Sequence, residues 1–585
     1  MATISGQGVD GETTQRILDF LNRAQTAADI AGKEPQAGPV HDDPRTGYGD
    51  QIADYDIGET VARRIIDRRM IYGVNGFTDL AQLSGIPGFG RDKFKDLVFS
   101  FGPASYGKWT VLPDSPVYVV HAAVLRTGKV LMYAGTAEVG YPLNSATWNP
   151  KTGTYKVQSG TDAYSDDLFC SHHVALADGN LLVNGGAVPG TARGIKATYE
   201  FNPSSETWVP KTDMQYARWY PTTVAVPVDK AITMSGYDHT VSIASKVESY
   251  DPHGNSHQGD WDTLPAGADR TLEIYPGLHL MPDGKILYTG TRWDGAKGPW
   301  VSPGTTALFD LATNTWSPVG DHVVRDRTEG MSVVLPPDNK RVLVIGGRGD
   351  RPISVSVSTN TVEMIDFNDA TPTWKQVAGM HYSRRNVNAV LLPTGRVLVC
   401  AGISGWKWGS PGPSPVYTAE EYDPTANKWV KLAAMKVPRQ YHSCSLLLPD
   451  ARVLNLGSVE SVHGAGHDLI KDVEVFSPPY LFRGPRPKIT SVDSVVHHGQ
   501  KFAIGTLKAA DIGSVVLVRP MAITHHTDSE QRVIPLKFTK KNSTTLTATA
   551  PNGNHPHYNA QRGYYMLFLV SKKDIPSEAK FVQLH

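Results

Sequence analysis

The chain of 585 residues has only three cysteines, at positions 170, 400 and 444, which excludes a scaffold held together by disulfides. It also lacks an excess of either charge, because 57 lysines and arginines balance 57 aspartates and glutamates. No net field therefore favours nucleic acid or an anionic membrane. No run approaches the roughly 18 apolar residues of a membrane helix, and the first 30 residues lack the apolar core of a signal peptide. A chain of this length exceeds one hydrophobic core, so we expect three folded units.

A repeat of strand, tight turn, strand and glycine recurs seven times along the middle of the chain. Its turns fall 51 to 56 residues apart, at Thr127, Asp178, Asp229, Asp283, Asp338, Thr394 and Asp450. Short apolar runs bounded by Gly, Asp and Pro are typical of strands joined by hairpins, and a period of about 50 residues is typical of kelch blades. We therefore predict a mainly β protein with a seven-bladed kelch-type β-propeller over residues 104–483, whose closed ring leaves no exposed sheet edge.

The ends of the repeats indicate how the ring closes. Most repeats end in an outer strand with a tryptophan, as in ETWVP and NKWVK, whereas the seventh ends in EVFSPPYLF and lacks such a strand. The segment GKWTVLPD at residues 107–114 precedes the first repeat. We expect this segment to complete the seventh blade.

Three further segments flank the predicted propeller. Residues 484–585 contain about seven short alternating strands, which predicts an immunoglobulin-like β-sandwich. Residues 1–48 form a polar segment with one helical pattern near Thr13–Ala28 and a linker rich in Gly, Pro and Asp. Residues 49–103 read twice as helix, glycine turn, helix, and are predicted to form a small α-helical domain.

This helical domain resembles the tandem helix-hairpin-helix units of DNA-uptake and secretion proteins. A glycine turn of this kind can present backbone N–H groups to a phosphate, and Arg91, Lys93 and Lys95 follow the second turn. No extended basic patch accompanies them, so a protein-docking or spacer role is favoured over nucleic-acid contact.

Unusual residues begin the innermost strand of each repeat, eight and nine positions before the turn. An ordinary structural repeat would place interchangeable apolar or small residues there. The column instead includes Cys170, Tyr220, Tyr275, Glu329, Arg385, Tyr441 and His442. Tyr441 and His442 together offer an oxygen and a nitrogen donor to a metal. On composition alone, a polar, water-filled channel entrance explains this column as well as a functional site does.

Four motifs favour the functional interpretation. They are DLFCSHH around Cys170, ARWYPTT around Tyr220, RQYHSCSLLLPD around Tyr441 and ITHHTDSEQRVIPL around His525. In this order they resemble the motifs of the copper radical oxidases, the family that includes galactose oxidase and glyoxal oxidase. The resemblance covers residues from about 105 to the C-terminus. The Arg-Trp-Tyr-Pro form of the Tyr220 motif is closer to the glyoxal oxidase branch.

The resemblance implies a site for one copper ion. Its metal ligands would be Tyr220, His442 and His525 in the equatorial plane, with Tyr441 axial. His525 rather than His526 is implied, because the family's ligand lies six residues before the glutamine of its QR-x-x-PL run, here at position 531. Cys170 and Tyr220 would be joined by a thioether, and the modified tyrosine would hold a stable radical.

The reaction implied by the resemblance oxidises a small alcohol or aldehyde and reduces O2 to H2O2. One copper ion conveniently cycles one electron, so the tyrosyl radical would supply the second. Tyr441 would accept the substrate's hydroxyl proton, a general-base role, and the Tyr220 radical would take hydrogen from the carbon. Family members act mostly outside the cell, so we expect an extracellular or cell-envelope location. The alternative is a kelch-propeller binding protein with an inactive copper site.

The chain departs from the sugar-oxidising relatives at two places. Those relatives cover the thioether with a stacked tryptophan, whereas this chain reads Met234-Ser-Gly-Tyr-Asp238 at the matching place, so Tyr237 or Trp219 would have to shield the radical. Tyr275 stands where galactose oxidase has the arginine that binds the sugar, which disfavours galactose as the substrate.

The remaining candidates have structural interpretations. His172 and His173 follow Cys170 directly, and since a strand alternates its faces, at most one of them can face the channel. Cys400 and Cys444 are expected to be small buried hydrophobic residues, with a disulfide between them left open. Glu329 and Arg385 could contact substrate or pair with each other.

Overall fold

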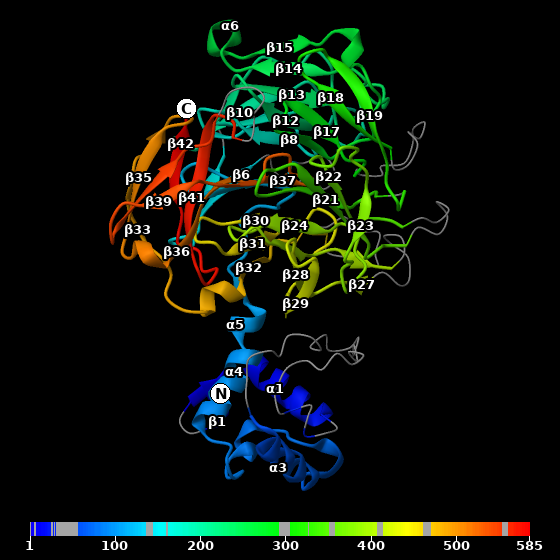
Figure 1. Cartoon of the computed structure of the whole chain (residues 1–585). Coiled ribbons are helices and arrows are strands. Elements are labelled where there is room, and N and C mark those ends of the chain that lie inside the picture. The colour runs from blue at the N-terminus through cyan, green and yellow to red at the C-terminus, as the bar shows by residue number, and fades with distance from the viewer. Residues whose placement is uncertain are drawn as a thin grey trace. The chain divides into compact units, whose positions relative to one another are not determined.

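The computed structural model describes residues 2–4, 7–24, 27, 30, 57–135, 144–159, 162–291, 305–325, 327–349, 357–405, 414–459, 470–552 and 560–585. The chain divides into two compact units. The first contains residues 1–108, 430–433 and 477–484, and the second contains residues 109–429, 434–476 and 485–585. Helices dominate the first unit and strands the second (Figure 1). Among the described residues, no helix is long and apolar enough to cross a membrane.

Among the described residues of the second unit, seven sheets follow the predicted repeat one after another, and each contains four antiparallel strands of that repeat. The first three are β4 (His121–Val124), β5 (Val130–Tyr133), β6 (Ser145–Asn149), β7 (Thr154–Gln158); β8 (His172–Ala175), β9 (Leu181–Asn184), β10 (Thr198–Asn202), β11 (Thr207–Pro210); and β12 (Thr222–Val226), β13 (Lys230–Met234), β14 (Glu248–Asp251), β15 (Asp260–Thr263). The next two are β16 (Leu278–Leu280), β17 (Lys285–Tyr288), β18 (Thr305–Asp310), β19 (Thr315–Asp321); and β20 (Met331–Leu335), β21 (Arg341–Ile345), β22 (Val362–Asp366), β23 (Lys375–Val377). The last two are β24 (Asn388–Leu391), β25 (Val397–Cys400), β28 (Thr418–Asp423), β29 (Lys428–Ala434); and β30 (Cys444–Leu447), β31 (Val453–Leu456), β32 (Val473–Ser477), β3 (Lys108–Leu112).

The first strand of each sheet lies innermost, where it contacts the first strand of a neighbouring sheet. Such contacts join β4 to β30, β8 to β12, β12 to β16, β20 to β24 and β24 to β30. These strands are buried on both faces, which explains why they read as continuous apolar runs. In the seventh sheet β3 is the outer strand beside β32, as expected for residues 107–114, and Trp109 packs on Phe476 at 4.9 Å between ring centroids. The arrangement is that of a propeller.

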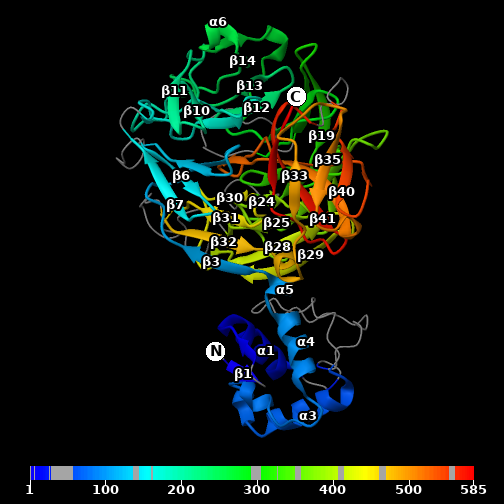
Figure 2. The same ribbon diagram turned by 90° about the vertical axis from the view of Figure 1, so that its left-hand side faces the viewer.

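A β-sandwich completes the second unit. One sheet contains β33 (Ile489–Val492), β35 (Lys501–Thr506), β40 (Thr545–Thr549) and β39 (Phe538–Lys540). The other contains β34 (Val495–Val496), β42 (Lys580–Leu584), β41 (Gly563–Ser571), β36 (Ile512–Arg519) and β38 (Arg532–Pro535). Their inner faces bury an apolar core that includes Phe502, Leu517 and Leu567. The sandwich is drawn in orange and red beside the propeller sheets (Figure 2).

Between β36 and β38 the chain leaves the sandwich and enters the propeller. β37 (Ala522–Thr524) pairs with β4 at the inner edge of the first sheet, and it also contacts β8 and β30. The residues from Met521 to Arg532 are all buried. This central hairpin, residues 520–532, brings a segment of the sandwich to the middle of the ring (Figure 1).

The helical unit includes the N-terminal residues, which differs from the separate polar segment predicted for residues 1–48. The hairpin β1 (Ala2–Ile4) and β2 (Gln7–Val9) precedes α1 (Gly11–Arg23), whose first turn is capped by the Asp10 side chain. α1 packs against α4 (Arg91–Phe101): Phe20 lies 4.7 Å from Phe101, and Arg16 donates to the Phe101 carbonyl at 3.3 Å. The buried face of α1 binds it to the helices, so α1 is part of this domain.

The two predicted helix-turn-helix segments each contain a single α-helix. The first consists of α3 (Glu59–Met70) and the 3-10 turn η1 (Gly73–Asn75). The second has only a 3-10 turn, η2 (Leu80–Leu83), before α4, because the Asp79 cap and the left-handed Gly85 leave room for one turn. α5 (Pro103–Tyr106) then leads toward β3. The helix-hairpin-helix function stays a prediction.

Candidate metal centre

The residues that precede the innermost strands share a strained backbone. The φ angle is positive at Cys170 (55°), Tyr220 (64°), Tyr275 (45°), Glu329 (61°), Asn386 (56°) and His442 (66°). Backbone N–H groups link successive sheets here, because Tyr220 donates to the Cys170 carbonyl at 3.0 Å and Tyr275 to the Tyr220 carbonyl at 2.9 Å. A left-handed non-glycine residue costs about 1–3 kcal/mol and persists only where its surroundings fix it. The strained conformation recurs from sheet to sheet, so the predicted column is a specific feature of the fold.

Four of the predicted ligands meet at the centre of this column. The Tyr220 and Tyr441 hydroxyls lie 2.8 Å apart, and the rings of Tyr441 and His442 lie 3.7 Å apart. His525 lies 5.2 Å from the Tyr220 ring and 4.7 Å from the His442 ring. The ligand atoms of Cys170, His442 and His525 all lie within 4.8 Å of one another. The second, third and seventh sheets and the central hairpin therefore supply one cluster of phenol, imidazole and thiol groups.

The cluster is enclosed, with Tyr441 the most exposed of the five side chains at 9%. Burial, and then the neighbouring His442 and His121 rings, hold the pKa of His525 well below its usual value. The ring is therefore neutral at ordinary pH and has a lone pair available for a metal. Its Nδ1 lies 2.6 Å from the Thr524 hydroxyl, while its Nε2 lies 3.3 Å from the Cys170 sulfur. Thr524 thus orients the ring toward the cluster.

The central hairpin is held in place by buried polar contacts. Arg519 forms an ion pair with Glu530 in the hairpin, at 2.5 Å between nitrogen and oxygen. The Gln531 side chain accepts from the Leu391 N–H at 2.9 Å and donates to the Ala389 carbonyl at 3.0 Å. Ser529 donates to the Thr223 carbonyl at 2.8 Å. Contacts with several sheets position His525 although it belongs to another domain.

Asp528 in this hairpin predicts a pH-dependent stability. Burial raises the pKa of Asp528 to about 7, above its unfolded value of about 3.9. Between these values the folded state retains a proton that the unfolded state loses, so the unfolding free energy falls as pH rises from about 4 to 7. We expect Asp528→Asn to raise the melting temperature at pH 8, by removing a penalty on the order of 4 kcal/mol, and to leave it unchanged at pH 4.

The asparagine oxygen can still accept the N–H groups of Glu530 and Gln531, which lie 2.7 and 3.0 Å from Asp528 Oδ1. Exposed Asp511 provides the control, since Asp511→Asn should shift neither melting temperature. Equal melting temperatures of wild type and Asp528→Asn at both pH values would contradict the assignment.

Of the two residues proposed to shield Tyr220, Trp219 lies directly beside it. The ring centroids of Trp219 and Tyr220 are 4.4 Å apart, and Tyr237 lies 6.1 Å from Trp219. Tyr275 packs on another side at 4.8 Å, and its hydroxyl donates to the Ser171 carbonyl at 2.7 Å. The indole of Trp219 is thus the nearer cover for the phenol.

The other candidates take structural positions. Arg385 forms a two-point ion pair with Glu329, so these residues pair with each other, and Arg348 lies 3.3 Å from the same carboxylate. Cys400 and Cys444 are free and buried, so they form no disulfide. His172 and His173 are both buried, and His173 lies 3.1 Å from the Tyr133 hydroxyl.

His121 is a neighbour of the site that the four motifs do not include. Its Nε2 accepts the Cys170 N–H at 3.1 Å, and its ring lies 6.0 Å from His525. The signal was present in the repeat, because His121 and His172 both stand six residues before their turns at Thr127 and Asp178. The two histidines at this shared repeat position would have indicated that His121 lies near the site.

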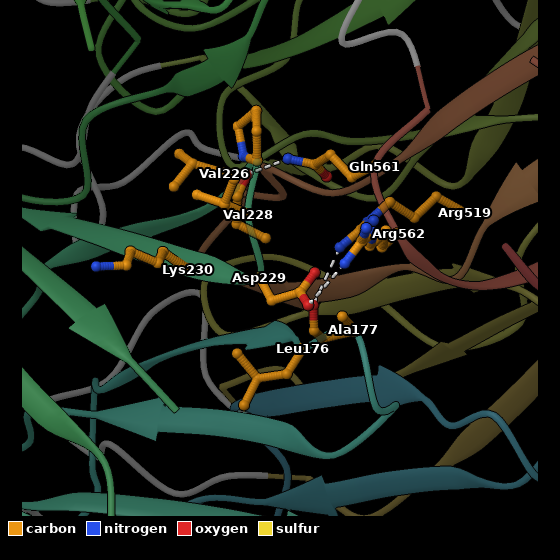
Figure 3. A pocket seen from close by; sticks show the side chains of 12 residues that line it. Leu176, Ala177, Val226, Val228, Asp229, Lys230, Arg519, Gln561 and Arg562 are labelled. Carbon is orange, nitrogen blue, oxygen red and sulfur yellow. Dashed lines mark hydrogen bonds and ion pairs between the residues drawn. The ribbon is translucent and has the colours of Figure 1, made fainter. Parts of the chain in front are cut away.

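A separate small pocket lies between the propeller and the sandwich (Figure 3). Arg562 reaches toward Asp229 at 3.6 Å, and Gln561 donates to the Ala225 carbonyl. The pocket adjoins the far ends of β8 and β12, whereas Cys170 and Tyr220 precede the near ends, so roughly 15 Å of strand separates them. Its volume of about 20 Å³ suits a water molecule, and it belongs to the domain interface.

Comparisons with known proteins point to the same chemistry. Residues 327–480 match the family model "Glyoxal oxidase N-terminus", and residues 486–584 match "Galactose oxidase-like, Early set domain". The chain is 25% identical to a galactose oxidase of Gibberella zeae over 569 residues, covering 92% of this chain and 78% of the relative. It is 26% identical to the aldehyde oxidase GLOX of Vitis pseudoreticulata over 544 residues, covering 82% and 97%.

A solved structure shows the same likeness. A fungal alcohol oxidase of the AA5 family, in complex with copper, superposes with a TM-score of 0.67 at 25% identity, covering 82% of this chain and 99% of that one. The family models, relatives and structure together support the galactose oxidase-like and glyoxal oxidase family of copper oxidases that the four motifs predict.

Proposed function

We propose that the protein oxidises a small alcohol or aldehyde at one copper ion, in the manner of a glyoxal oxidase, and reduces O2 to H2O2. The observation that carries this proposal is the meeting of two phenols and two imidazoles, Tyr220, Tyr441, His442 and His525, in one enclosed cluster. Oxygen and nitrogen donors of this kind suit divalent copper. When bound, copper would exchange one of the two electrons that the reaction moves.

The protein's own side chains would supply the rest of the chemistry. Tyr441, the most exposed of the group, would accept the proton of the substrate hydroxyl. Tyr220, as an oxidised phenol, would take a hydrogen atom from the carbon that bears that hydroxyl. The two electrons and two protons lost by the substrate convert O2 to H2O2.

We further propose a thioether between Cys170 and Tyr220. Both side chains lie in one buried cluster, and their backbones are joined by the 3.0 Å hydrogen bond. Forming the bond between sulfur and the ring removes the S–H and one ring hydrogen as two protons and two electrons, which O2 accepts. The modified tyrosine would be easier to oxidise than an ordinary phenol.

Mass analysis of the denatured protein tests the thioether. After copper treatment in air, the linked peptides that hold Cys170 and Tyr220 should be lighter by two hydrogens, whereas zinc-treated protein should keep both peptides separate. The peptides with Cys400 and Cys444 serve as internal controls, because both thiols are buried elsewhere. A free thiol at position 170 in catalytically active protein would contradict the radical mechanism.

The close approach of Cys170 to both histidines favours a second candidate. A thiolate with two imidazoles is a set that binds zinc, so Cys170 could be a ligand in a propeller binding protein with an inactive copper site. Reconstitution with copper, mild oxidation and a peroxide assay with glyoxal, glycolaldehyde and simple alcohols distinguishes the two. Peroxide release supports the oxidase, and tightly held zinc without peroxide supports the alternative.

A further inference from the structure

A row of aromatic rings, His121, Tyr133, Trp208 and Tyr199, leads away from the candidate metal centre through the first two sheets. His121, which accepts the Cys170 N–H, stacks on Tyr133 at 4.5 Å with ring planes only 9° apart. Tyr133 contacts Trp208 at 5.3 Å, edge to face, and Trp208 contacts Tyr199 at 6.3 Å. The rings are in van der Waals reach from the centre to the outer part of the second sheet.

The row of aromatic rings ends at Tyr199, next to two exposed residues. The Tyr199 hydroxyl donates to the Asp166 carboxylate at 2.6 Å and lies 2.9 Å from the Ser165 hydroxyl. Asp166 and Ser165 are exposed, although the Tyr199 ring is 4% exposed. The last phenol is therefore covered by protein and joined to solvent through a carboxylate.

Two phenols in the row of aromatic rings have a hydrogen-bond partner that can take a proton. Tyr133 lies 3.1 Å from His173 Nδ1, and Tyr199 lies 2.6 Å from Asp166 Oδ2. A phenol that loses an electron becomes a strong acid, so it is oxidised reversibly only where the proton can leave and return. Both pairs meet that condition.

The second sheet has more tyrosine rings around its outer-strand tryptophan than the third sheet has. Trp208 belongs to the outer-strand tryptophans of the repeat, and the rings of Tyr133, Tyr164 and Tyr199 surround it at 5.3, 4.9 and 6.3 Å. Trp261, at the same place in the third sheet, contacts Tyr250 at 5.0 Å. Repeat packing explains a tryptophan at both places, but it does not require three tyrosines around one of them.

We propose that His121, Tyr133, Trp208 and Tyr199 form an electron relay that carries oxidising equivalents from the centre to the surface. The relay rests on the proposed function, because copper and the peroxide product are the source of those equivalents. Reduction of one H2O2 to two waters takes two electrons and two protons. The reduced centre would supply one electron, the relay the other, and solvent water both protons. Tyr199 releases its proton to Asp166, and a small donor such as ascorbate restores the electron and proton.

Such a relay would protect the centre from its own product. Peroxide oxidises the Cys170 sulfur, in steps of which the later ones are irreversible while it is a thiol, and to a sulfoxide once it is a thioether. An electron that arrives from Tyr199 removes the oxidant before it attacks Cys170. Oxidation then falls on Tyr199, which is joined to solvent through the exposed Asp166 carboxylate, and a donor can reverse it there.

The test is oxygen incorporation, mapped by mass analysis of peptides after full-length protein, loaded with cuprous ion so that the centre starts reduced, meets H2O2 without substrate. In wild type, oxygen should enter the peptide with Tyr199 and should be suppressed there by ascorbate. In Trp208→Phe, incorporation at Tyr199 should fall about tenfold and rise at Cys170, since each 1.4 kcal/mol of added barrier slows transfer tenfold. Trp261→Phe is the matched control, with the same truncation at the same repeat position, and should behave as wild type.

Asp166→Asn is a second variant that leaves the aromatic packing intact, since Asp166 is exposed. It removes the proton acceptor and should also lower incorporation at Tyr199. Unchanged incorporation in both Trp208→Phe and Asp166→Asn, or equal incorporation in zinc-loaded protein, would overturn the relay. The relay assay needs only copper and peroxide. Labelled Tyr199 without aldehyde turnover would therefore reject the oxidase and keep the relay, whereas turnover without such labelling would reject the relay alone.

Discussion

Tyr220→Phe is expected to lower the rate of peroxide formation from small aldehydes by about 10³-fold or more, because a side chain that acts in the chemical step contributes about 10²–10⁴-fold. The change removes the hydroxyl that lies 2.8 Å from Tyr441, and with it the oxygen donor and the oxidisable phenol. Loss of one hydrogen bond costs only about 1 kcal/mol, so the protein should remain folded. The measurement is kcat with the copper content of each preparation determined in parallel.

Tyr237→Phe is the control for Tyr220→Phe. It removes a hydroxyl from a ring that lies beyond Trp219, and it should retain most of the activity. A Tyr220→Phe protein that bound copper and kept wild-type kcat would refute the proposed role of this phenol. Equal losses in both variants would instead indicate a general disturbance of the cluster.

His525→Ala is expected to weaken copper binding by roughly 10³-fold, beyond the 10–100-fold typical of changes that only support a ligand. The ring lies within ligand distance of both Cys170 and His442 and is the part of the cluster that the central hairpin supplies. Its neutral form at ordinary pH means that this loss should be nearly the same at pH 6 and pH 8, because few protons compete with the metal there. Competition titration with a copper chelator measures it.

His526→Ala separates the ligand from its neighbour. Burial lowers the pKa of His526 to about 3, and His526 is not among the residues whose ligand atoms gather within 4.8 Å of one another. Removal of His526 should lower stability and leave copper affinity within about tenfold of wild type. A larger loss of copper affinity in His526→Ala than in His525→Ala would show that His526, and not His525, is the ligand.

The propeller and three of the candidate site residues could be predicted from sequence because they follow a repeat. Each innermost strand is an apolar run at a fixed distance from a turn, so aligning the turns is enough to place Cys170, Tyr220 and His442 in one column. The left-handed backbone of that column could not be predicted, because cysteine, tyrosine and histidine rarely adopt it. His525 has no place in the repeat, so periodicity alone would have missed it and only its motif revealed it.

The helical unit was harder to predict because its packing joins distant segments. The contact of Phe20 with Phe101 and the hydrogen bond from Arg16 to the same residue span about 80 positions, which no local pattern reveals. Leu80–Leu83 read as a helix but form only a 3-10 turn, since Asp79 and Gly85 limit its length. Local sequence predicts each helix separately, whereas the packing of the unit depends on which helix faces contact one another.

The order in which the chain leaves the ribosome gives the central hairpin a further meaning. His525 is 355 residues later than Cys170, and it is carried by the sandwich, which is synthesised after the propeller. A nascent or truncated chain that stops before the sandwich would hold the two tyrosines, the thiol and one imidazole, but no complete set of donors. On the proposed function, production of an oxidant would thus begin only after the sandwich has been made and folded.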